Sequence, residues 1–112
     1  MLENEYAELN TYTLRASQTV ADYYDRLDSL TEKDKQYIIE KILAELDIVL
    51  LWTMNIRHQL LMQLSTAPGA YKIALNQALS ELKVTQDSAK TLSFNFTAVY
   101  HGSRDHIKEG LS

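Results

Sequence analysis

The chain has 112 residues and 46% of them are hydrophobic, which is enough for one core and too little for two. Its net charge of −4 argues against a nucleic-acid partner, because nucleic-acid surfaces concentrate lysine and arginine. It has no cysteine, which excludes disulfides and thiol nucleophiles, and its acidic start does not resemble a signal peptide, so we expect a cytoplasmic protein.

The first predicted helix covers about residues 3–29. Apolar or aromatic side chains, with one threonine among them, recur along it at alternating steps of four and three: Leu2, Tyr6, Leu9, Thr13, Ala16, Val20, Tyr23, Leu27 and Leu30. A repeat of about 3.5 residues is typical of helices that pack side by side with a left-handed supercoil, as in a coiled coil.

The second predicted helix covers about residues 32–65 and is the most apolar. It carries Ile39, Ile42, Leu46, Val49, Thr53, Ile56 and Leu60 at the same steps. Two capping boxes mark its start, Ser29 with Glu32 and Thr31 with Asp34, and one of them should satisfy the free backbone N–H groups there. Pro68 and Gly69 mark the next reversal of the chain.

The third predicted helix covers about residues 69–101. It repeats the pattern with Tyr71, Leu75, Ala78, Leu82, Thr85, Ala89, Leu92, Phe96 and Val99. Gly102 can adopt the left-handed conformation that commonly closes a helix, so the sequence predicts a short tail over 103–112.

These elements predict a single all-α domain over 1–112, an elongated up-down-up three-helix bundle with heptad packing. Short connections should place the first and third helices parallel, both in contact with the second. A break near Asn55 would give a four-helix bundle instead. The expected core is Leu9, Val20, Leu27, Ile42, Leu46, Val49, Ile56, Leu75, Leu82, Leu92 and Phe96. Thr13, Thr53 and Thr85 should form a polar layer across its middle.

Candidate catalytic and metal-binding residues are few. The segment Arg57-His58-Gln59-Leu60-Leu61 resembles the phospho-acceptor helix of histidine-kinase dimerisation domains, although the turn at 68–69 follows it within about three helical turns. The resemblance implies a phosphotransfer bundle that uses His58. A polar surface histidine is the alternative, and we expect no catalytic residue.

Acidic side chains do not predict a metal site either. Asp22, Asp25 and Asp28 lie on a single helix, whereas bundle metal sites draw ligands from facing helices. His101, Asp105 and His106 could bind a metal weakly, but a frayed terminus is the expected structure there. We therefore expect neither a metal nor a cofactor.

The outer side of the second helix is the candidate partner-binding surface, because two neighbouring helices would leave part of its apolar surface uncovered. The residues are Ile48, Leu51, Trp52, Asn55 and Met62. They predict a non-enzymatic protein-interaction module, such as an adaptor, chaperone-like subunit, inhibitor or assembly component, acting as a homodimer or with another protein. A membrane-active bundle that hides the uncharged run 48–56 is a further alternative, although that run is too short to span a bilayer.

Overall fold

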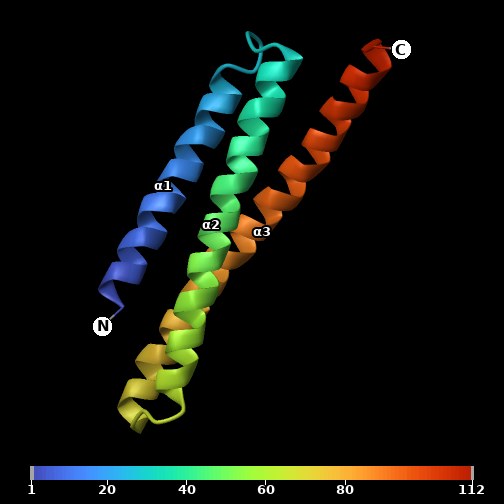
Figure 1. The fold of residues 1–112 in the computed structure, drawn as a ribbon. Coiled ribbons are helices and arrows are strands. Elements are labelled where there is room, and N and C mark those ends of the chain that lie inside the picture. The colour runs from blue at the N-terminus through green and yellow to red at the C-terminus, as the bar shows by residue number, and fades with distance from the viewer. Residues whose placement is uncertain (1, 112) are drawn as a thin grey trace.

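The computed structural model describes the backbone of residues 2–111 and the side chains of residues 2–102. This part of the chain forms three helices and no strand: α1 (Glu3–Asp25), α2 (Glu32–Leu64) and α3 (Gly69–Leu111). They run up, down and up along a molecule of 64 × 21 × 16 Å (Figure 1). The predicted elongated three-helix bundle is confirmed.

The end of α1 lies earlier than predicted, at Asp25 and not near residue 29. The carbonyl oxygen of Arg26 accepts hydrogen bonds from the backbone N–H groups of Ser29 and Leu30, at 3.0 and 3.1 Å. The Ser29 hydroxyl donates to the same oxygen. These bonds close a turn in place of a further helical turn, and Leu30 is thereby buried in the core.

Thr31 caps the start of α2, so the cap comes from the second of the two predicted pairs, Thr31 with Asp34. Its backbone is extended, and its hydroxyl oxygen accepts a hydrogen bond from the Asp34 N–H at 3.1 Å. The acidic side chains of Glu32 and Asp34 lie in the first turn, where they interact favourably with the helix dipole.

No break interrupts α2 near Asn55, so the four-helix alternative is wrong. The helix continues to Leu64, and residues 65–68 reverse the chain. The carbonyl oxygen of Pro68 accepts the first backbone hydrogen bonds of α3, from Tyr71 and Lys72. Proline fits here because it lacks only a donor that the start of a helix does not use.

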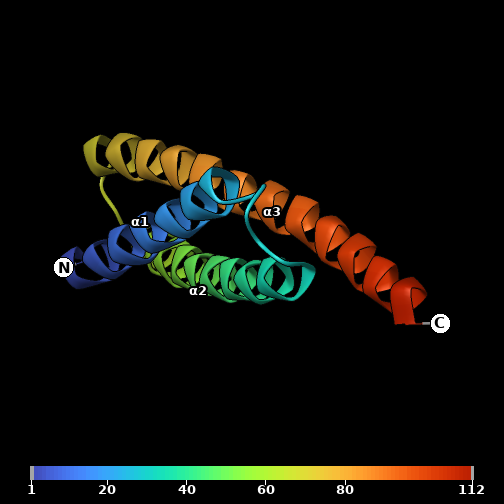
Figure 2. The same ribbon diagram turned by 90° about the horizontal axis from the view of Figure 1, so that it is seen from above.

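The prediction that the third helix ends near His101 is wrong. Helix α3 continues through Gly102 to Leu111, and no described glycine has a positive φ. Glycine costs a helix only about 1 kcal/mol relative to alanine, and good helix formers such as Arg104, Lys108 and Glu109 follow it. In both ribbon views this last part of α3 diverges from the start of α2 (Figures 1 and 2).

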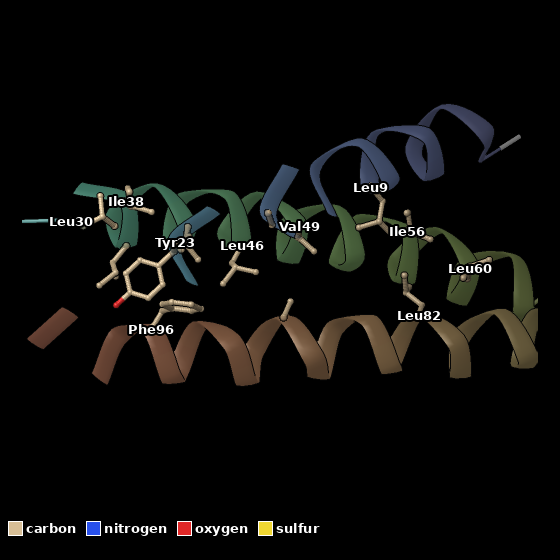
Figure 3. Packing of buried hydrophobic residues seen from close by; sticks show 14 of the residues in the cluster. Leu9, Tyr23, Leu30, Ile38, Leu46, Val49, Ile56, Leu60, Leu82 and Phe96 are labelled. Atoms are coloured by element: carbon tan, nitrogen blue, oxygen red, sulfur yellow. The ribbon is translucent and has the colours of Figure 1, made fainter. Parts of the chain in front are cut away.

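Helix α2 is the central element of the bundle. Helices α1 and α3 both pack on it, whereas no described Cα atom of α1 lies within 8 Å of one in α3. Aromatic side chains nevertheless bridge the two outer helices: the rings of Tyr23 and Phe96 form an edge-to-face pair with centroids 5.7 Å apart (Figure 3). The bundle is therefore open between α1 and α3.

The core follows the heptad pattern most closely on α2, where all seven repeat positions are buried. Leu9 from α1 and Leu82 from α3 approach Ile56 of α2 (Figure 3). Eight of the eleven predicted core residues are buried, whereas Val20 and Leu27 are half-buried and Leu92 is 38% exposed. Val20 and Leu92 line the open cleft between α1 and α3, whereas Leu27 lies in the turn that follows α1.

The predicted threonine layer is formed in part. Thr13 and Thr85 line the same cleft, beside Leu46 and Val49 of α2. Thr53, one helical turn beyond Val49, is fully buried, and its hydroxyl donates to the Leu50 carbonyl oxygen at 2.7 Å. The Thr13 hydroxyl oxygen is also buried, but it has no hydrogen-bond partner among the described residues.

Candidate functional site

The five residues predicted to bind a partner divide into two groups. Leu51, Asn55 and Met62 are exposed on α2, with Leu51 and Met62 at 64% and 61%. Ile48 and Trp52 are half-buried, and Trp52 packs against the core cluster. We call these five residues the outer face of α2. Leu51, Asn55 and Met62 are accessible, whereas Trp52, the largest side chain of this face, also contributes to the bundle.

The position of these residues follows from the periodicity of the α-helix. The buried repeat of α2 runs through Val49, Thr53 and Ile56, and Leu51 lies roughly 140–160° around the helix from these residues at 100° per residue. The backbone that buries one set of side chains therefore directs Leu51 to the solvent. Asn55 accepts a hydrogen bond from the Gln59 amide at 2.8 Å, which orders the polar part of this face.

Two further exposed apolar side chains, Met54 and Leu61, were not predicted from the sequence. They lie beside the outer face, on the side of α2 that faces α3. The signal that could have found them is the absence of acidic residues from 48 to 64, where Arg57 and His58 are the only residues that can carry charge. The first half of α2 instead alternates acidic and basic residues, as a solvated surface does.

A second feature is the open cleft between α1 and α3, with a volume of about 460 Å³. In each outer helix one repeat position is buried, while the other is half-buried or exposed. The buried set is Leu9, Ala16 and Tyr23 on α1 and Leu75, Leu82, Ala89 and Phe96 on α3. None of the residues that line the cleft is charged, and many are small.

Among the described residues, the histidine and tyrosine side chains are distributed over all three helices. His58 is exposed on α2, and no group of three metal-binding side chains occurs among the described residues. Burial raises the pKa of Tyr23 and of Tyr6 above the ordinary value for tyrosine, so both phenols stay neutral near pH 7. The Asp105 and His106 side chains lie outside the described residues.

The aspartates of α1 are part of its solvated surface. Asp22 forms an ion pair with Arg26 at 3.2 Å, and both side chains are about half exposed. Exposed pairs of this kind contribute little to stability, at most about 1 kcal/mol. The uncharged run of residues 48–56 has Val49, Thr53 and Ile56 in the core. None of the described helices offers an apolar stretch long enough to cross a lipid bilayer.

Comparison with protein-family models, curated proteins and solved structures finds no match. Function is therefore inferred from the surfaces of the chain itself.

Proposed function

We propose that this chain is a non-enzymatic protein-interaction module and that it forms a homodimer through the outer face of α2. The observation that supports the proposal is the exposure of Leu51 and Met62 on a helix segment without acidic residues. Large apolar side chains grouped on a soluble surface are typical of partner-binding sites, and charged residues are depleted from their centres.

The proposal is also consistent with the different exposure of the residues on the outer face. Leu51 and Met62 project outward, while Trp52 is held against the core and keeps a partly exposed ring surface. A side chain that is already fixed loses little conformational entropy on association, so a half-buried tryptophan suits an interface.

Sedimentation equilibrium of the wild-type protein tests the proposal, with Leu51→Glu as the variant and Leu14→Glu as its control. Leu14 is a leucine of similar exposure, 59% against 64%, on α1. We expect a dimer for the wild type and for Leu14→Glu, and a monomer for Leu51→Glu, because a carboxylate buried in an apolar interface is strongly unfavourable. Helix content should be equal in all three. A wild-type protein that stays monomeric at high concentration, or a Leu14→Glu variant that dissociates equally, would contradict the proposal.

A second candidate function is histidine phosphotransfer, which is favoured by the exposure of His58. A phospho-acceptor must be open to a donor molecule, and His58 meets this requirement on a rigid helix. Reaction with phosphoramidate, followed by ³¹P NMR, tests it against His101, which is also exposed. A phosphotransfer site should react faster at His58 than at His101, whereas equal rates would mean two ordinary surface histidines.

A further inference from the structure

A groove of about 750 Å³ runs between α2 and α3 and is lined by residues of these two helices only. Its apolar residues are Leu50, Met54 and Leu61 from α2 and Leu79 and Leu82 from α3. Met54 and Leu61 are exposed although they are large and apolar. The groove thus offers apolar contact area that the chain does not cover itself.

The charged residues that line this groove are mainly basic. Arg57, Lys83 and Lys90 stand against the single acid Asp87, a local sum of +2 (3 − 1) in a chain with a net charge of −4. None of the three bases forms an ion pair with another described residue. The cleft between α1 and α3 has no charged lining, so this basic character distinguishes the α2–α3 groove.

The dimensions of the groove suit a helix. Its lining on α3 extends from Asn76 to Lys90, which corresponds to about 21 Å or four turns at 1.5 Å per residue. Lys83 and Lys90 are seven residues apart, so they lie on the same side of α3, about two turns from each other. Two carboxylates at the same spacing on a docked helix would face both ammonium groups.

We propose that the α2–α3 groove binds an acidic amphipathic helix of a partner protein. The partner helix places apolar side chains at helical spacing over Met54 and Leu61, and carboxylates toward Arg57, Lys83 and Lys90. This is recognition of a helix in a groove, with apolar area supplying affinity and complementary charge supplying specificity. The proposal does not depend on the homodimer, because the outer face of α2 and this groove are different surfaces.

A display selection tests the proposal. The library consists of 18-residue amphipathic helices with leucine at every first and fourth heptad position and with either glutamate or lysine at the flanking positions. We expect the full chain to enrich glutamate-rich helices. For the most enriched peptide, labelled with fluorescein, the Arg57→Glu/Lys83→Glu variant should weaken binding by about tenfold or more, because the reversed charges repel the peptide. Added salt should also weaken binding to the wild type.

Lys33→Glu is the control, because Lys33 is an exposed base at the other end of α2 and does not line the groove. This variant should bind the peptide as the wild type does. Met54→Ser is the second variant, and it should weaken binding without changing the charge of the groove.

Three results would overturn the proposal. The first is a selected pool without excess glutamate, or binding that survives Arg57→Glu/Lys83→Glu. The second is binding to phosphatidylserine vesicles that depends on Lys83 when no peptide is enriched, which would assign the groove to a membrane surface. The third is loss of self-association in Lys83→Glu, which would assign it to a second copy of the chain. A monomeric wild type that still binds acidic helices would refute only the homodimer.

Discussion

Leu46 and Leu51 are the same residue type on the same helix, but their surroundings are opposite, with exposed fractions of 3% and 64%. Leu46→Ala should lower the free energy of unfolding by about 2–5 kcal/mol, because it removes buried methyl groups and leaves a cavity. Leu51→Ala should change the free energy of unfolding of the monomer by less than about 0.5 kcal/mol. Urea unfolding followed by circular dichroism, at a concentration where the chain is monomeric, measures both. Equal losses would mean that α2 does not present the faces described.

The cap of α2 gives a second test at the level of single residues. Thr31→Ala removes the side-chain acceptor for the Asp34 N–H and should cost about 1 kcal/mol. Ser29→Ala, in the same connection, removes only an exposed hydrogen bond to the Arg26 carbonyl oxygen and should cost less. The same unfolding measurement compares them. A larger loss for Ser29→Ala would assign the cap to the first capping box.

Much of the core could be predicted from the spacing of apolar residues, since a heptad pattern identifies which side of a helix faces its neighbours. Val20, Leu27 and Leu92 could not be placed in this way. The burial of Val20 and Leu92 depends on whether α1 and α3 approach each other, and this distance is set by the crossing of both helices on α2. Leu27 lies beyond the end of α1, where the chain has left the helix. Likewise the helical periodicity of α2 predicts which residues form its outer face. It does not predict the partial burial of Trp52, which depends on the neighbouring helices.

At the scale of elements, the C-terminal end of α3 does not follow the local preference of its glycine. Gly102 can close a helix, but it lies within one, and a Cβ atom added there would meet nothing within 4 Å. Gly102→Ala should therefore stabilise this end of α3 by about 0.5–1 kcal/mol, because alanine loses less backbone entropy in a helix.

Amide hydrogen exchange of residues 98–106 measures this effect locally. Slower exchange in Gly102→Ala is expected, with Gly69→Ala as a control at the other end of the helix, where residues 98–106 should be unaffected. Faster exchange in Gly102→Ala would indicate that the glycine adopts a left-handed conformation in solution.

The cleft between α1 and α3 leads to a prediction about neighbouring residues of α3. Both Ala89 and Ser88 line the cleft, but Ala89 lies at its buried floor, with 4% of its surface exposed, whereas Ser88 is exposed. Ala89→Leu should destabilise the protein by about 1–3 kcal/mol through overpacking. Ser88→Leu should be tolerated or slightly stabilising, since the cleft has room for the added side chain. Thermal melts of the two variants give the comparison, and similar losses for both would show that the cleft closes in solution.

At the scale of the whole molecule, one helix packs on two others, and within the described part of the chain the Cα atoms of those two stay more than 8 Å apart. An extended shape with a thickness of 16–21 Å leaves a large surface for the volume it encloses. The sequence predicted the order and direction of the helices correctly. It could not predict the open side, because the same heptad pattern is compatible with a closed trigonal bundle.

Association should therefore contribute to stability, and this gives the last prediction. If the folded chain dimerises, its melting temperature rises with protein concentration, because binding of the folded form alone shifts the unfolding equilibrium. Leu51→Glu should abolish this dependence while keeping the melting temperature of the dilute wild type.

Trp52→Ala should weaken association by about 2 kcal/mol, as the loss of an aromatic residue near an interface centre does. It should also lower the melting temperature at every concentration, because Trp52 packs on the core as well. Calorimetry over a hundredfold range of concentration distinguishes the two variants. A Trp52→Ala protein with reduced stability but unchanged concentration dependence would restrict the role of this side chain to the bundle.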